Sequence, residues 1–68
     1  MNRLHYNVSG LLNEQIKTQV KNALNNIEGV QNVNVDLGRS TIEVGCKDTI
    51  SAEVIENSIE KVGCKIQA

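Results

Sequence analysis

The residues best suited to metal or redox chemistry in this sequence are two cysteines, Cys46 and Cys64. Thiolates bind soft metal ions such as Cu(I), and a close pair of thiols can also respond to redox state. The spacing Cys-x17-Cys matches no common set of metal ligands. The two cysteines therefore form a candidate soft-metal or redox site if the fold brings them together. Otherwise they are small buried hydrophobic residues.

No other set of residues indicates catalysis. The sequence has one histidine, His5, and no Ser/His/Asp set, Cys/His pair at a persuasive spacing, or glycine-rich phosphate loop. Three carboxylates, Glu53, Glu56 and Glu60, recur at helical spacing, which is typical of a solvated helix face and also compatible with an acidic docking patch. We therefore predict that the protein is not an enzyme.

The composition excludes several classes of protein. The 68 residues carry a net charge of −1, and the one aromatic residue is Tyr6, so we expect neither a nucleic-acid surface nor a base-stacking platform. No apolar run approaches the roughly 20 residues of a membrane span, and nothing before Val8 resembles a signal peptide. Two cysteines are too few for a disulfide scaffold. We expect one cytoplasmic, monomeric domain over residues 1–68, without a membrane partner.

Apolar and polar residues alternate in four segments, which predicts four half-buried strands. These are residues 3–8, 32–37, 41–46 and 64–67, and Gly38-Arg39 is expected to join the middle two in a hairpin. The polar positions of these strands should form one open face that meets solvent or a polar partner. They are Arg3, His5, Asn7, Asn32, Asn34, Asp36, Thr41, Glu43, Lys65 and Gln67.

Two further segments have the spacing of amphipathic helices. Over residues 14–27 an apolar stripe recurs every three or four positions, with Asn13 as the expected N-cap and Gly29 as the left-handed residue that ends the helix. A second helix is predicted to start after Ser51 and to end at Gly63. Lys17 and Lys21 give the first helix a small basic patch.

The predicted order of elements is βαββαβ, an α+β fold. Its simplest architecture is the ferredoxin-like sandwich, a four-stranded antiparallel sheet of order 4-1-3-2 with both helices on one face. We expect the first and third strands to run parallel, which places Cys46 and Cys64 near the end of the first strand, beside Gly10. About 9–10 Å of sheet would separate them, beyond the ~7 Å limit of a disulfide. A shared soft-metal site and two separate buried thiols both remain open.

Several stretches resemble the heavy-metal-associated domain of copper chaperones and metal-transporting ATPases. They are Val8–Ile16, Ile27–Val35 with its Gly-Val-x-x-Val-x-Val element, and Asp48–Ser51, followed by Gly63-Cys64. The resemblance covers about Leu4 to Ile66. It implies metal-ion binding or trafficking, with Cu(I) or another soft metal ion as the cargo. It also implies docking on a metal-transporting ATPase, or on another protein, through the first loop and the adjacent helix face.

The first loop differs from the pattern that the resemblance implies, Gly-Met-x-Cys-x-x-Cys. Gly10 keeps the glycine and Leu11 replaces the methionine, whereas Asn13 and Ile16 stand at the two cysteine positions. The usual thiolate site is therefore absent from these positions. We expect Leu11 to be buried as an anchor and Leu12 to be exposed.

Two alternatives to metal binding follow. The domain could act as a metal-independent adaptor that keeps the docking surface. Alternatively, Ser9-Gly10-Leu11-Leu12 resembles the entry of amino-acid-binding regulatory domains of the same topology.

Overall fold

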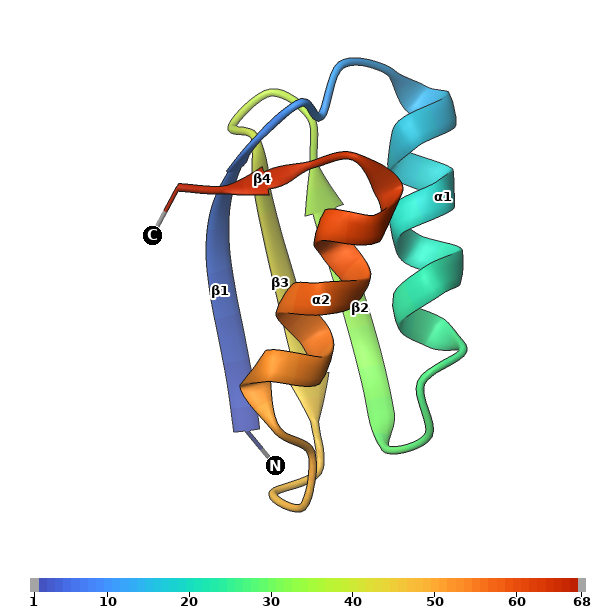
Figure 1. Ribbon diagram of the computed structural model, residues 1–68, viewed down its shortest axis with the longest axis vertical. Helices are drawn as coiled ribbons and strands as arrows, with labels where there is room; N and C mark the ends of the chain where they lie inside the picture. Colours follow the sequence, from blue (N-terminus) through green and yellow to red (C-terminus); the bar gives the residue numbers. More distant parts are fainter. Residues whose placement is uncertain (1, 68) are drawn as a thin grey trace.

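The computed structural model describes residues 2–67 and contains the six expected elements in the order βαββαβ (Figure 1). The strands are β1 (Asn2–Ser9), β2 (Val30–Asp36), β3 (Thr41–Cys46) and β4 (Lys65–Ile66), and the helices are α1 (Glu14–Asn25) and α2 (Ala52–Val62). The fourth strand is shorter than predicted, and Cys64 precedes it.

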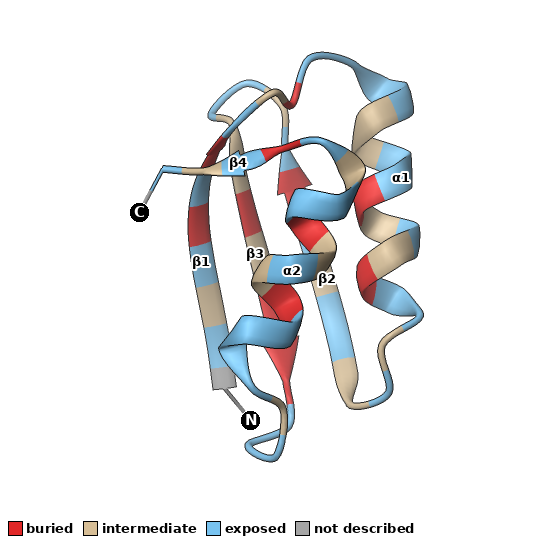
Figure 2. Ribbon diagram, viewed as in Figure 1, coloured by how far each residue is buried: buried red, intermediate tan, exposed pale blue. Residues whose placement is uncertain are grey.

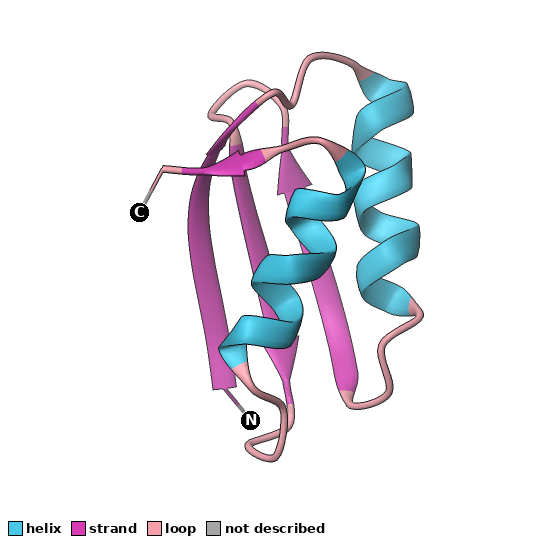
Figure 3. Cartoon of the chain, in the orientation of Figure 1, coloured by secondary structure: helices cyan, strands magenta, loops and turns pink. Residues whose placement is uncertain are grey.

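The strands form one four-stranded sheet of order β2-β3-β1-β4, which is the predicted order read from the other edge. Both helices lie on the same face of this sheet (Figure 3). The ferredoxin-like fold with an open antiparallel sheet is thus confirmed. Because one sheet face has no helix, polar side chains can cover it.

The direction of one strand pair differs from the sequence-based expectation. β1 and β3 are antiparallel, with Leu4 opposite Val44 and Tyr6 opposite Ile42, so the expected parallel pairing was wrong. The reason lies in the connections. The crossover through α1 makes β1 and β2 run the same way, and the hairpin after β2 then reverses β3.

The helix starts follow the predicted capping. The Asn13 side chain accepts a hydrogen bond from the Ile16 N–H at 3.0 Å, and the Ser51 hydroxyl accepts one from the Glu53 N–H at 3.2 Å. These bonds satisfy amide groups that have no partner within the helix. Gly63 ends α2 with φ of 114°, as expected.

Gly29 does not end α1, contrary to the prediction. The helix stops at Asn25, and Asn26 caps it in a right-handed conformation. Gly29 instead has φ of 99° in a separate turn, which a hydrogen bond from the Val30 N–H to the Ile27 carbonyl closes at 3.1 Å. The sequence pattern correctly predicted a left-handed residue at position 29, but this residue belongs to the turn that follows α1 and not to the end of the helix.

The core lies between the sheet and the helices (Figure 2). It consists of aliphatic side chains, both cysteines and Tyr6, and its buried members are Tyr6, Val8, Leu11, Val20, Leu24, Val35, Ile42, Val44, Cys46, Ile55, Ile59 and Cys64. Tyr6 donates its hydroxyl proton to Glu56 on α2 at 3.2 Å. That bond satisfies the polar end of a side chain that is otherwise buried.

The polar face of the sheet is open, as predicted. All of its predicted residues are exposed or half-buried, and Arg3 of β1 forms an ion pair with Glu43 of β3 at 3.1 Å. Both side chains of this pair are substantially solvated, so the pair contributes little to stability.

Replacing Gly29 by alanine should destabilise the fold by about 1–3 kcal/mol. A Cβ atom there would lie 2.5 Å from Cδ1 of Ile50, and φ of 99° is strained for any L side chain. Gly38→Ala is the control, because a Cβ at Gly38 meets only Oδ1 of Asp36 at 3.5 Å. Urea unfolding should give a lower free energy of unfolding for Gly29→Ala than for Gly38→Ala. Equal free energies of unfolding for the two would contradict this account.

Tyr6 should titrate late in the folded protein. Burial, with the neighbouring Glu56 carboxylate adding to it, raises the pKa of Tyr6 from 10.0 to about 12. Since the folded state holds this proton more tightly, stability should fall as pH rises from about 10 to about 12. Absorbance at 295 nm reports Tyr6 alone, because it is the one aromatic residue. A folded protein in which Tyr6 titrates near 10 would refute the prediction, and Tyr6→Phe should reduce the slope of stability in this range, with the raised pKa of the Cys64 thiol still contributing to it.

Candidate functional site

The loop between β1 and α1 is held against the junction of α2 and β4. Gly10 has φ of 88°, and a Cβ atom built on it would lie 3.1 Å from the Gly63 carbonyl oxygen and 3.5 Å from Cα of Cys64. Glycine removes that steric conflict and tolerates the left-handed conformation. The loop therefore begins at a fixed position, directly beside the end of α2.

The two leucines of the loop have opposite environments. Leu11 is 6% exposed and belongs to the core, whereas Leu12 is 80% exposed. Both agree with the expectations from the sequence. A buried neighbour fixes the backbone from which Leu12 projects, so the exposed leucine lies on an anchored segment.

The next positions provide no soft ligand. The side-chain oxygen of Asn13 accepts the Ile16 N–H as the helix cap, and Ile16 is a partly buried hydrocarbon that packs on the core. Cu(I) prefers thiolate and thioether ligands. Within residues 2–67 there is no cluster of three or more His, Cys, Asp or Glu side chains that could hold a metal ion. The residues at positions 13 and 16 therefore do not provide the ligands that Cu(I), the cargo of a thiolate loop, prefers.

The structure does not bring Cys46 and Cys64 together. Cys46 lies opposite Asn2, at the start of β1, whereas Cys64 lies beside Gly10, just beyond the end of β1. The eight residues of β1 span about 25 Å, which separates the two ends of the sheet. The shared thiol site required parallel β1 and β3, and the antiparallel pairing removes it.

Each cysteine is instead a separate core residue. Cys46 and Cys64 are both 1% exposed, and both are free thiols. Burial raises the pKa of the Cys64 thiol. A thiol that stays protonated is a poor nucleophile and a poor ligand, so Cys64 next to the loop behaves as packing.

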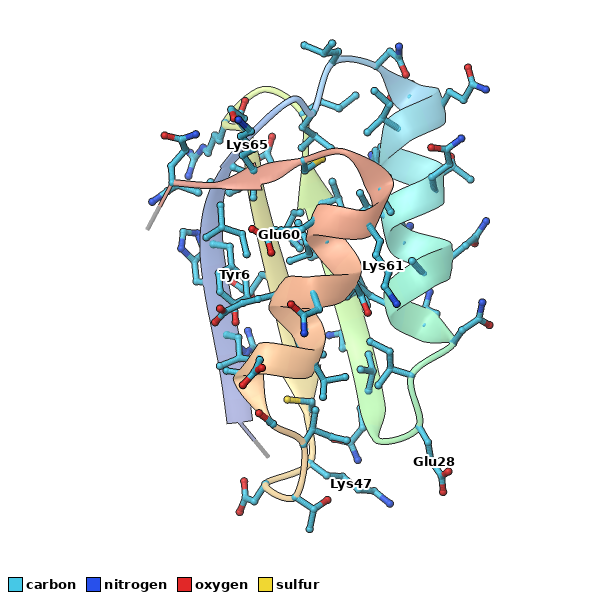
Figure 4. The ribbon with its side chains drawn as sticks, in the orientation of Figure 1. Tyr6, Glu28, Lys47, Glu60, Lys61 and Lys65 are labelled. Atoms are coloured by element: carbon cyan, nitrogen blue, oxygen red, sulfur yellow. The ribbon has the colours of Figure 1, made fainter. Side chains whose placement is uncertain are left out.

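One basic side chain, Lys65, lies at the loop end of the molecule. Lys65 follows the end of α2, its Cα pairs with that of Ser9, and Figure 4 shows it at the same end as the first loop. Lys61 lies in the last turn of α2, and in the described part of the chain neither Lys61 nor Lys65 forms an ion pair. Lys17 lies 4.0 Å from Glu14, which partly neutralises it. Figure 4 shows the Lys61 side chain directed back along α2, away from the loop, so the site combines an exposed leucine with one uncompensated positive charge, that of Lys65.

Sequence reasoning assigned Lys65 only to the open face of the sheet. The available signal was the register of the fourth strand, since pairing with β1 places Lys65 opposite Ser9, next to Gly10. The sequence had already placed Cys64 beside Gly10, which the structure confirms, and the same argument places the next residue, Lys65, at this end.

Comparison with known proteins places this geometry in a family. The heavy-metal-associated domain profile matches residues 5–65. No curated protein matches the chain, and no helix among the described residues is long and apolar enough to span a membrane.

Solved structures share the fold over nearly the whole chain. The structure of a CopZ metallochaperone is 29% identical to this chain and has a TM-score of 0.92. The match covers 96% of this chain and 98% of the metallochaperone chain. A copper-binding domain from HMA7, a P-type ATPase, is 27% identical and has a TM-score of 0.88. The match covers 100% of this chain and 96% of that domain. A putative copper-ion-binding protein from Bacillus anthracis str. Ames is 24% identical and has a TM-score of 0.91. The match covers 97% of this chain and 94% of that protein.

The family profile spans far more than half of the chain, and the sheet order and the two helices agree with the fold of the related structures, whereas the first loop lacks the two cysteines. This chain belongs to the heavy-metal-associated domain family.

Proposed function

We propose that this domain acts in copper trafficking as a docking module, which presents its first loop to a metal-handling partner and does not hold Cu(I) between residues 13 and 16. The observation that carries this proposal is the loop itself. Leu12 is 80% exposed on a segment that Leu11 and Gly10 anchor, at the place where the family pattern has its metal ligands.

The association with copper rests on the family and on two relatives. The metallochaperone CopZ and the copper-binding domain of the P-type ATPase HMA7 are each more than 25% identical over nearly their whole length. These are the two kinds of protein between which a trafficking domain docks. A metal-transporting ATPase or its chaperone is therefore the partner we infer. The family match also favours this role over an amino-acid-binding regulatory domain.

The chemistry of the loop supports docking without chelation. A neutral amide oxygen already engaged as a helix cap is a weak ligand for a soft cation, and Ile16 has no donor atom. By contrast, an exposed apolar side chain on a rigid backbone can be buried by a partner at little entropic cost. Lys65 would then pair with an acidic group beside the contact and increase the association rate at low salt. Nothing in this role requires catalysis.

We also propose the cytoplasm as the location of the domain. Its two cysteines are free and lie at opposite ends of β1. Such thiols suit a reducing compartment.

Replacing Leu12 by serine should weaken docking by about tenfold and leave stability nearly unchanged, since the side chain is exposed. The partner to use is the metal-binding domain of the copper ATPase from the same organism, titrated against the labelled protein by NMR in the apo and Cu(I) forms. Shifts should centre on Gly10–Asn13. Val54→Ser is the matched control, because among the described residues Val54 is the other large exposed hydrophobic side chain, and it lies near the start of α2. Equal losses in both variants, or no binding by the parent, would refute the docking role.

Restoring thiols should create metal binding that the parent lacks at this loop. We expect Asn13→Cys with Ile16→Cys to bind one Cu(I) in competition with a chromogenic chelator, because the loop still places both positions at the helix N-terminus. Asn13→Ser with Ile16→Ser reproduces the loss of Ile16 without adding thiols. The proposal fails if the parent removes Cu(I) from the chelator as strongly as the double-cysteine variant.

A further inference from the structure

The strand β2 forms one edge of the sheet, and half of its backbone groups point away from β3. The Lys47 N–H donates to the Gly29 carbonyl at 3.0 Å, so Lys47 turns its backbone toward the β2 side. Backbone groups alternate in direction along a strand, so Gly45 and Glu43 turn the same way, toward Asn32 and Asn34. The N–H and C=O groups of Val33 and Val35 therefore point outward from the edge.

This edge lacks the usual protection against pairing. Natural edge strands are typically very short, or carry lysine or proline. β4, the other edge, has two residues, whereas β2 has seven and contains neither lysine nor proline. The one β2 irregularity, a register shift between Val30 and Asn32, leaves residues 32–36 regular. Asp36 is the one charged residue of β2, and it lies at the end of the strand.

We propose that two copies of this chain pair through β2, antiparallel, about a two-fold axis at Asn34. In this register the outward groups of Val33 face those of Val35 of the partner copy, so all four residues of these two pairs can exchange backbone hydrogen bonds. The register uses residues 32–36, the regular part of β2. It would join the two sheets into one continuous sheet of eight strands.

The side chains are self-complementary in this register. On the helix-covered face Val33 meets Val35, so two apolar pairs form. On the open face Asn34 meets its own copy, and each Asn32 amide meets an Asp36 carboxylate, so no carboxylate faces another. A register in which Asp36 faced Asp36 would bring like charges together. The charge pattern therefore favours pairing with a second copy of this chain, in this register over the one that places Asp36 opposite Asp36.

The inferred dimer is weak and does not depend on the docking role. It uses one strand from each copy, which is far below the area of a stable obligate interface. The monomer expected from the sequence therefore persists at low concentration. β2 and β4 are opposite edges of the sheet, so pairing leaves Lys65 free for a partner at the loop.

Sedimentation velocity over a wide concentration range, combined with amide hydrogen exchange by NMR, tests the inference. We expect the protein to sediment faster as its concentration rises, with growing protection at the Val33 and Val35 amides. The Asn32 and Asn34 amides, already bonded to β3, should not change. Asn34→Lys places two ammonium groups at the axis and should raise the dissociation constant of the dimer by at least several-fold.

Asn7→Lys is the matched control, because Asn7 is exposed on the same face but belongs to the central strand β1. It should dimerise like the parent. The inference is overturned if the parent stays monomeric at millimolar concentration, if Val33 and Val35 exchange at a rate independent of concentration, or if Asn34→Lys dimerises as well as Asn7→Lys. None of these results bears on binding by the first loop.

Discussion

The close approach of Gly10 to the end of α2 is the contact on which the functional end of this molecule depends. A side chain at position 10 would press on the Gly63 carbonyl and on Cys64, and the backbone at both glycines is left-handed. With no Cβ there, β1 passes directly into a loop that lies on the α2–β4 junction. Leu11 then enters the core and Leu12 leaves it. The exposure of Leu12 is thus a consequence of where the glycine holds the chain.

The fold was largely predictable because local and tertiary signals agree. Alternation over Leu4 to Val8 and the stripe through Val20 and Leu24 each fix a face, and the polar caps Asn13 and Ser51 fix where the helices begin. These signals are local, so a single sequence contains them. Strand direction is different in kind, because it depends on how a crossover and a hairpin combine. The alternation of residues along β1 and β3, taken by itself, does not indicate the relative direction of the two strands.

The same distinction explains the outcome at the candidate site. The burial of Leu11 and the cap at Asn13 were predicted correctly, because both depend on residues that are close in the sequence. The pairing of Cys46 with Cys64 failed because it depended on the direction of β3. Gly29 failed for a related reason. A glycine after a helix predicts a left-handed residue, but the sequence does not say whether the helix or a following turn will use it.

A cap and a metal ligand place opposing demands on position 13. The amide groups at a helix N-terminus can satisfy the oxygen of a capping side chain or stabilise a nearby thiolate, which is why reactive thiols favour such positions. Asn13 uses the Ile16 N–H for capping, which adds on the order of 1 kcal/mol to helix stability. A ligating thiolate would need that same region free and the loop mobile enough to reach the ion. In this chain the loop is anchored by Leu11 and Gly10 and closed by the cap, so its rigidity suits a surface that a partner recognises better than a site that must rearrange around a metal.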